Sequence, residues 1–200
     1  MKIIGITGGV GSGKSMILEY LREQTFEPAV VIEADRVAYE LQRKGNLCYD
    51  AIVNAFGCDI LDEAEEIDRY KLGSIVFQDE EQLRRLNALV HPLVKQEIVD
   101  RIRTEREKNS AAYLFIEAAL LIEEHYDEIC DELWYIYVSK EQRYERLRTS
   151  RGYSDEKIAQ IMNNQLEEET FRRHCQVVID NTGSKEDTFR QLREVFAWQN

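Results

Sequence analysis

The amino-acid sequence predicts an α/β fold, with a three-layer core around a five-stranded parallel sheet, a helical insertion and a helical lid. Three observations support this fold class. Short apolar runs of strand length alternate with segments of helical periodicity. A glycine-rich stretch containing a lysine follows the first run. Two long helical stretches interrupt the alternation. Because a strand, a crossover helix and a second strand make a parallel pair, the alternation predicts a mainly parallel sheet.

Five apolar runs are the candidate strands, and they cover residues 2–7, 29–34, 113–118, 133–138 and 176–180. Helical spacing of apolar residues is found at 14–24, 36–43, 140–148 and 185–197. Two of these helices begin with a capping pair, Ser139 with Gln142 and Ser184 with Asp187. Strands and helices thus follow one another in the order that a parallel α/β core requires.

Two helical stretches do not fit a simple crossover. Residues 45–108 are too many for one connection, and we expect an inserted subdomain with turns at 56–59 and at the His91-Pro92 pair. Residues 140–174 carry six arginines that alternate with glutamates, namely Arg143, Arg146, Arg148, Arg151, Arg172 and Arg173. These arginines are either an ordinary solvated helix face or part of a lid that closes over a bound phosphate.

The glycine-rich stretch matches a phosphate-binding motif. Gly8, Gly13, Lys14 and Ser15 fit G-x-x-x-x-G-K-[ST] between an expected strand and an expected helix. The loop residues that would bind ATP are Gly9, Val10, Gly11, Ser12, Gly13, Lys14, Ser15 and Met16. Glycine lets backbone N–H groups converge on phosphate oxygens, Lys14 would reach the β- and γ-phosphates, and Ser15 would bind Mg²⁺. The alternative, a flexible turn that matches by accident, is disfavoured by this context. The core is therefore of the P-loop NTPase type.

Composition limits the partners of the chain. The 200 residues are 44% hydrophobic, which suffices for one sizeable core with an insertion. The formal net charge of −12 argues against nucleic acids and anionic membranes as partners. The four cysteines have no metal-ligand spacing and are expected to be reduced and buried. No apolar stretch is long enough to cross a bilayer, so we expect a cytoplasmic protein.

Acidic residues follow two of the expected strands. Glu33 and Asp35 end the second strand, and would share a face if the strand continued, while Glu117 ends the third. Ligands of open α/β sheets bind beyond the carboxyl ends of the strands. Asp35 is therefore either a catalytic carboxylate or the N-cap of the helix that follows it. Glu117 either orients a magnesium-bound water or is a buried structural acid.

Taken together, these motifs resemble the dephospho-CoA kinase family over nearly the full chain. The segments that carry the resemblance are GITGGVGSGKS, EADRVAYEL, FGCDIL, IDRYKLGSIVF, LNALVHPLV, EAALLIE and VVIDNTGS. The resemblance implies phosphorylation of the ribose 3′-hydroxyl of dephospho-CoA with ATP and Mg²⁺. It also implies a nucleotide-binding core of residues 1–44, 109–139 and 175–200, an acceptor subdomain at 45–108 and a lid at 140–174.

The resemblance further assigns roles to single residues. Asp35 would be the base or the residue that orients the hydroxyl, with Lys14 and Arg146 as the other catalytic residues. Arg69 and His91 would lie near the acceptor, together with Asp35 and Glu117. His91-Pro92 could equally be the junction between two helices, with proline in the first turn of the second.

The chain departs from the family pattern at five positions, Met16, Glu33, Glu117, Ala119 and Ser150. Because arginine is frequent at the last of these, the sequence does not decide which of Arg146, Arg148 and Arg151 contacts ATP. Two alternatives remain: another small-molecule or nucleoside kinase with the same loop, or a non-catalytic nucleotide-binding module. We expect a monomer or a weak homo-oligomer.

Overall fold

The computed structural model of the chain describes residues 1–24 and 28–199. The chain divides into two compact units. The first, here called the sheet unit, contains Met1–Val31 and Lys108–Asn200. The second, the helical unit, contains Ile32–Glu107. Each unit has its own core and is described by itself.

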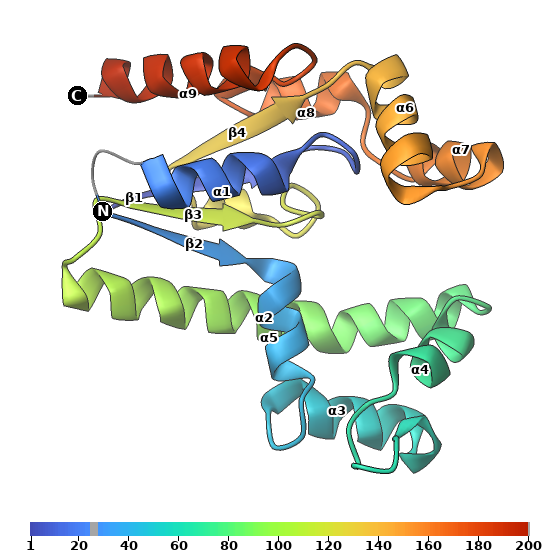
Figure 1. Cartoon of the computed structure of the whole chain (residues 1–200). Helices are drawn as coiled ribbons and strands as arrows, with labels where there is room; N and C mark the ends of the chain where they lie inside the picture. The colour runs from blue at the N-terminus through green and yellow to red at the C-terminus, as the bar shows by residue number, and fades with distance from the viewer. Residues whose placement is uncertain (25–27, 200) are drawn as a thin grey trace. The chain divides into compact units, whose positions relative to one another are not determined.

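A parallel sheet is the centre of the sheet unit (Figure 1). Its strands are β1 (Lys2–Thr7), β2 (Ala29–Glu33), β3 (Tyr113–Glu117), β4 (Glu132–Tyr137) and β5 (Val177–Asp180). They lie in the order β2-β3-β1-β4-β5, which confirms the predicted five-stranded parallel α/β fold. Since β1 pairs in parallel with both β3 and β4, the chain that leaves β1 emerges at the middle of the sheet.

Helices cover both faces of this sheet. α1 (Lys14–Gln24) and α9 (Lys185–Gln199) contribute Ile17, Leu21 and Leu192 to a core that also contains Trp134 of β4. Tyr135 is the next residue along β4 and therefore points to the opposite face. There its ring stacks on Phe171 of α8 (Glu168–His174), with 4.7 Å between ring centroids. The sheet unit thus has the three layers expected from the sequence.

Two further helices of the sheet unit precede α8. They are α6 (Lys140–Arg151) and α7 (Asp155–Asn163), and a short 3₁₀ turn, η2 (Tyr126–Glu128), lies before β4. The Ser139 hydroxyl caps α6 by accepting a hydrogen bond from the Gln142 amide at 3.3 Å, as the sequence predicts. Gly152 ends the helix in the left-handed conformation, with φ of 62°, which glycine adopts without steric cost.

The helical unit contains the last residues of β2 and four α-helices. These are α2 (Ala34–Leu41), α3 (Leu47–Phe56), α4 (Arg69–Val76) and α5 (Glu80–Lys108), and a 3₁₀ turn, η1 (Cys58–Ile60), follows α3. The turn at 56–59 agrees with the expected break. No helix in residues 1–24 and 28–199 is long and apolar enough to span a membrane.

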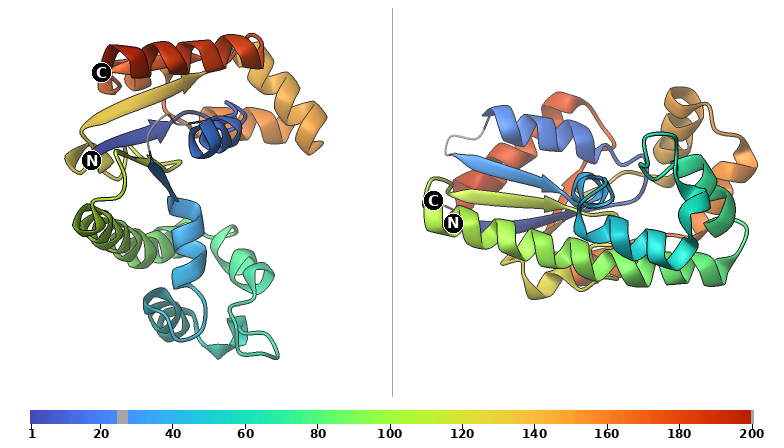
Figure 2. Two further views of the ribbon diagram at one scale, coloured as in Figure 1. Left: turned by 60° about the vertical axis from the view of Figure 1, so that its left-hand side comes forward. Right: turned by 90° about the horizontal axis from the view of Figure 1, so that it is seen from below.

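The break expected at His91-Pro92 is wrong. Both residues lie inside α5, which runs unbroken through Pro92 (Figure 2). Proline in a helix interior costs about 3 kcal/mol relative to alanine, since it cannot donate the backbone hydrogen bond. One buried stripe spans the proline: Val90, Val94, Ile98 and Ile102. Each fully buried aliphatic side chain contributes about 1.5–3 kcal/mol, so this stripe can outweigh the cost of the proline.

The expected end of the second strand also needs correction. β2 stops at Glu33, and α2 begins at Ala34, so Glu33 and Asp35 do not share a strand face. Asp35 is not the N-cap either, because that position belongs to Glu33 and Asp35 lies in the first helical turn. The apolar periodicity explains the early start: Ala34, Val37 and Leu41 are all buried on one face of α2.

Candidate active site at the glycine-rich loop

Most carbonyl groups of the loop between β1 and α1 accept a hydrogen bond. Five carbonyls of residues 8–13 do so, some from the loop and α1 and some from distant parts of the sheet unit. The donors are Lys14 Nζ to Gly8 at 2.8 Å, Ser12 N to Gly9 at 3.0 Å, Arg143 Nε to Val10 at 3.1 Å, Asn181 Nδ2 to Ser12 at 2.7 Å and Ile17 N to Gly13 at 3.4 Å. Arg143 and Asn181 therefore hold the loop from outside at Val10 and Ser12.

Because a trans peptide is planar, its C=O and N–H groups point in opposite directions. Fixing a carbonyl therefore also fixes the direction of the N–H group of the following residue. In the part of the chain that the structure describes, the N–H groups of Gly9, Val10, Gly11 and Gly13 have no protein acceptor. A set of converging donors at a helix N-terminus binds phosphate, since the helix dipole adds partial positive charge.

Gly13 is the residue at which this arrangement requires glycine. Its φ is 87°, a left-handed conformation that side chains disfavour. A Cβ atom at this position would also lie 2.4 Å from Asn181 Nδ2. Any larger residue would push away the amide that holds the Ser12 carbonyl.

Lys14 and Glu117 meet at the carboxyl ends of β1 and β3. Glu117 is paired with Ile6 across the two strands, which places it beside the exit of β1. The distance from Lys14 Nζ to Glu117 Oε1 is 3.5 Å, and both side chains are 13% exposed. Lys14 is thus held beside the loop by an acid and by the Gly8 carbonyl. Glu117 is engaged by this lysine, as either of its two predicted roles allows.

Ser15 fits a magnesium ion that is bound mainly through phosphate. It is exposed at the start of α1, directly after the glycine-rich loop. Mg²⁺ usually keeps several waters and takes only one or two protein oxygens when it is bound to a nucleotide. The described residues contain no group of three or more His, Cys, Asp or Glu side chains that could hold a metal. A single hydroxyl next to a phosphate cradle is the donor set that suits Mg²⁺ with ATP.

Arg146 reaches the same loop from α6. Its Nη2 donates to the Asn181 carbonyl at 2.7 Å, and its Nη1 would lie 3.5 Å from a Cβ at Gly13. The other lid arginines are placed differently. Arg172 and Arg173 pair with Glu168 and Glu169 on the surface of α8, as the solvated-face alternative expects. Arg148 and Arg151 are exposed.

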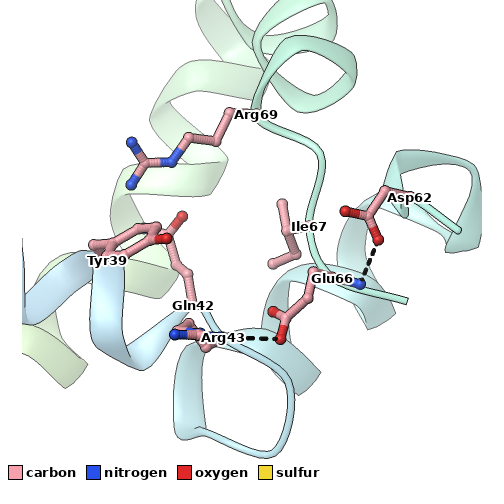
Figure 3. A pocket seen from close by; sticks show the side chains of 7 residues that line it. All are labelled: Tyr39, Gln42, Arg43, Asp62, Glu66, Ile67 and Arg69. Atoms are coloured by element: carbon pink, nitrogen blue, oxygen red, sulfur yellow. Dashed lines mark hydrogen bonds and ion pairs between the residues drawn. The ribbon is translucent and has the colours of Figure 1, made fainter. Parts of the chain in front are cut away.

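The remaining predicted residues belong to the helical unit. Arg69 lines a pocket of about 450 Å³, together with Tyr39, Gln42, Arg43, Asp62, Glu66 and Ile67 (Figure 3). Its guanidinium lies over the Tyr39 ring, 4.3 Å from the ring centroid. Asp35 is exposed one turn before Tyr39 on α2, and positions four apart share a helix face. His91 lies on α5 and does not line this pocket.

The acids of this pocket are already occupied. Asp62 Oδ1 accepts the backbone N–H groups of Ala64 and Glu66, each at 2.9 Å. Glu66 accepts the Lys44 amide at 3.0 Å and lies 3.9 Å from Arg43 Nη2. Within the described residues, Arg69 has no hydrogen-bond acceptor or carboxylate partner. The pocket therefore offers an oriented guanidinium to an anionic ligand.

Comparison with known proteins identifies the family. A family model described as dephospho-CoA kinase matches residues 2–187. The chain belongs to the dephospho-CoA kinase family. It is accordingly an enzyme, a kinase that phosphorylates dephospho-CoA with ATP to give coenzyme A. The alternatives of another small-molecule kinase and a non-catalytic module are not favoured.

Curated members of the dephospho-CoA kinase family match over nearly the full chain. The enzyme of Streptococcus mutans is 38% identical over 191 residues, which is 96% of this chain and 94% of the relative. The enzyme of Carboxydothermus hydrogenoformans is 38% identical over 193 residues, which is 96% of this chain and 91% of the relative. The similarity to these relatives therefore extends over nearly the whole chain.

Solved structures agree with this assignment. Dephospho-CoA kinase from Campylobacter jejuni superposes with a TM-score of 0.72 at 26% identity, covering 98% of this chain and 96% of that one. A protein of Thermus thermophilus gives a TM-score of 0.80 at 30% identity, covering 100% and 98% of the two chains. Shikimate kinase from Acinetobacter baumannii, at 12% identity and a TM-score of 0.56, shares the fold.

Sequence reasoning missed three residues of these sites: Asn181, Arg143 and Tyr39. Asn181 is in the N-T-G turn after β5, where no sequence pattern marks it, yet its side chain is buried against the loop. Arg143 is one of the six arginines in residues 140–174, and no sequence pattern distinguishes it from the other five. Tyr39 had no signal at all, because its role depends on the ring lying under Arg69.

Proposed function

We propose that Asp35 orients and deprotonates the ribose 3′-hydroxyl of dephospho-CoA while the glycine-rich loop holds ATP. The observation that carries the ATP half of this proposal is that the N–H groups of Gly9, Val10, Gly11 and Gly13, at the start of α1, have no acceptor within the described residues. The 3′-oxygen forms a bond to the γ-phosphorus, and the bond from that phosphorus to the β,γ-bridging oxygen breaks. The hydroxyl proton passes to the Asp35 carboxylate, and ADP leaves.

The catalytic roles follow from the position of each side chain. Lys14, beside the loop, stabilises the charge on the transferring phosphoryl group, and Arg146 adds a second cation from α6. The loop residues 9–16 bind the ATP phosphates. Ser15 would hold Mg²⁺ through its hydroxyl, and the ion would supply charge neutralisation to the phosphates. Catalysis is thus mainly positioning and electrostatic stabilisation.

The acceptor side of the proposal rests on the pocket of the helical unit. Arg69 offers guanidinium donors above Tyr39, one helical turn along α2 from Asp35. Guanidinium groups bind phosphate in a bidentate manner. The central diphosphate of dephospho-CoA is therefore a ligand that Arg69 could bind. His91 and Glu117 complete the acceptor-binding set that the family resemblance implies.

The proposal also covers the organisation of the chain. Residues 1–44, 109–139 and 175–200 form the nucleotide-binding core, residues 45–108 bind the acceptor and residues 140–174 act as the lid. Residues 32–44 belong to the helical unit, and from there Asp35 and Tyr39 contribute to the acceptor side. The partners are ATP and dephospho-CoA, without nucleic acid, in agreement with the net charge of −12. The kinase works in the cytoplasm as a monomer or a weak homo-oligomer.

The test is ADP release by the purified protein with Mg-ATP, comparing dephospho-CoA with adenosine, nucleoside monophosphates and pantothenate. We expect turnover with dephospho-CoA alone. Asp35→Asn should lower kcat by a factor on the order of 10²–10⁴, the usual contribution of a general base, while ATP binding stays intact. Lys14→Ala should nearly abolish turnover. Full activity of either variant would contradict the mechanism, and turnover with another acceptor would overturn the substrate.

A further inference from the structure

Arg143 makes contacts that set it apart from the other arginines of the lid. It lies on α6 and is partly buried, whereas Arg148 and Arg151 on the same helix are exposed. Its Nε donates to the Val10 carbonyl at 3.1 Å. Its Nη2 donates to the side-chain oxygen of Gln165, which follows α7. One guanidinium thus connects the glycine-rich loop to the segment between α7 and α8.

The loop is shaped to receive this side chain. A Cβ atom at Gly9 would lie 2.3 Å from Arg143 Nη2 and 2.4 Å from its Cζ. Such distances are well below van der Waals contact, so any side chain at position 9 would displace the guanidinium. Glycine at position 9 therefore leaves room for Arg143 to reach the loop.

The surroundings of Arg143 contain no ionised partner for its charge. Within the described residues its acceptors are a peptide carbonyl and an amide oxygen, both neutral. The nearby Tyr135 phenol stays protonated, because burial raises its pKa to about 12. Burial in turn lowers the pKa of the Arg143 guanidinium. Lys140, Glu167 and Glu168 line the adjoining cavity of about 410 Å³.

A partly buried cation without a carboxylate is costly, since neither of its neutral acceptors offsets the lost hydration. Its hydrogen bonds nevertheless have a specific geometric effect. The Val10 carbonyl belongs to the same planar peptide as the Gly11 N–H, and the two groups point in opposite directions. By holding this carbonyl, Arg143 also fixes the direction of the Gly11 N–H.

We propose that Arg143 is a positioning residue for ATP binding, which fixes the Val10–Gly11 peptide and links it through Gln165 to the segment after α7. The guanidinium acts through this peptide and does not itself contact a phosphate. Its planar fork supplies two donors in a fixed relation, one for Val10 and one for Gln165. A lysine could retain the charge but could not make both contacts in this geometry.

This proposal is tested with Arg143→Gln, Arg143→Lys and Gln165→Leu. Hydrogen bonds from charged donors contribute about 1.5–3 kcal/mol, so we expect Arg143→Gln to raise KM for ATP by roughly tenfold or more. KM for dephospho-CoA should stay unchanged, and kcat should fall far less than in the Lys14 variant. Arg143→Lys should behave like Arg143→Gln. Gln165→Leu should show the same pattern with a smaller rise.

Arg173→Gln is the matched control, because it removes the same charge from a surface ion pair on α8. It should leave both KM values unchanged. Equal increases in both KM values, an unchanged KM for ATP, or full rescue by lysine would each overturn the proposal. Titration calorimetry of ATP binding to the same variants gives a readout that does not depend on turnover. An inactive wild type would thus refute the proposed function, and the calorimetry would still decide the role of Arg143: ATP affinity that is equal in wild type and Arg143→Gln would overturn it.

Discussion

A single buried side chain, Asn181, connects three parts of the sheet unit. Its amide nitrogen donates to the Ser12 carbonyl at 2.7 Å, and its amide oxygen accepts from the Thr188 hydroxyl of α9 at 2.8 Å. Its own carbonyl accepts from Arg146. The loop, α9 and α6 are therefore coupled through one residue that is 3% exposed.

Replacement of Asn181 by aspartate tests this connection. The two side chains have the same shape. A carboxylate, however, cannot donate a hydrogen bond to the Ser12 carbonyl, and its negative charge is repelled by that oxygen. Leaving buried groups unsatisfied costs about 1–3 kcal/mol, so the free energy of unfolding should fall by that amount. Urea denaturation measures the change. Thr188→Val, which removes the hydroxyl that donates to Asn181 Oδ1, should cost less. A fully stable Asn181→Asp would refute the coupling.

At the scale of elements, α5 shows how packing can override a local signal. Pro92 lies in the middle of the helix, and the local rule ends or kinks helices at proline. The buried stripe of Val90, Val94, Ile98 and Ile102 continues on both sides of it. The folded protein therefore still bears the free-energy cost of a proline inside a helix, and the buried stripe offsets this cost.

Removal of this proline should therefore stabilise the helical unit. Pro92→Ala restores a backbone donor and a strong helix former, so we expect the free energy of unfolding to rise by about 1–2 kcal/mol. This gain is smaller than the full difference in helix propensity between the two residues. Replacing proline by alanine also raises the conformational entropy of the unfolded chain, which partly offsets the stabilisation. Arg106→Ala, on an exposed part of α5, serves as the control. A loss of stability in Pro92→Ala would mean that the proline fits the helix without strain.

At the scale of the whole molecule, most of the residues proposed to bind ATP and most of those proposed to bind dephospho-CoA lie in different units. The glycine-rich loop, Lys14 and Arg146 belong to the sheet unit, and Asp35 and the Arg69 pocket belong to the helical unit. Under the proposed function, ATP and dephospho-CoA should leave separate footprints on the protein.

Hydrogen exchange measured by mass spectrometry can detect these footprints. Mg-ATP should slow exchange in peptides that cover residues 8–16. Dephospho-CoA alone should slow exchange in peptides from residues 32–107, especially those with Tyr39 and Arg69, because bound ligand closes the local opening that exchange requires. Protection of the sheet unit alone by dephospho-CoA would refute the acceptor-binding role of the helical unit.

Features that depend on residues close together in the chain could be predicted from the sequence. Features that depend on long-range contacts could not. The strands, the loop motif and the Ser139 cap follow from residues close in the chain, and the structure has them. The uninterrupted α5 depends on packing along the whole helix. The sequence analysis starts this helix at residue 36, but α2 begins at Ala34. The acidic pair Glu33 and Asp35 suggests a strand, whereas the apolar spacing of Ala34, Val37 and Leu41 fits a helix.

The expected burial of the cysteines holds for two of them. Cys48 and Cys175 are buried, and burial raises their thiol pKa values to about 11 and about 12. Cys58 is exposed in η1. The contacts of Asn181 and Arg143 with the loop link residues more than 130 positions apart, which no local pattern records.

The N–H groups of the glycine-rich loop also have a consequence for the rate at which ATP arrives. These N–H groups attract phosphate only over a few ångströms, whereas the net charge of −12 repels a nucleotide anion from much farther away. Added salt screens the long-range repulsion, with a Debye length of about 10 Å at 0.1 M, but leaves the short hydrogen bonds largely intact. ATP should therefore associate faster as ionic strength rises, even though its site is built to bind an anion.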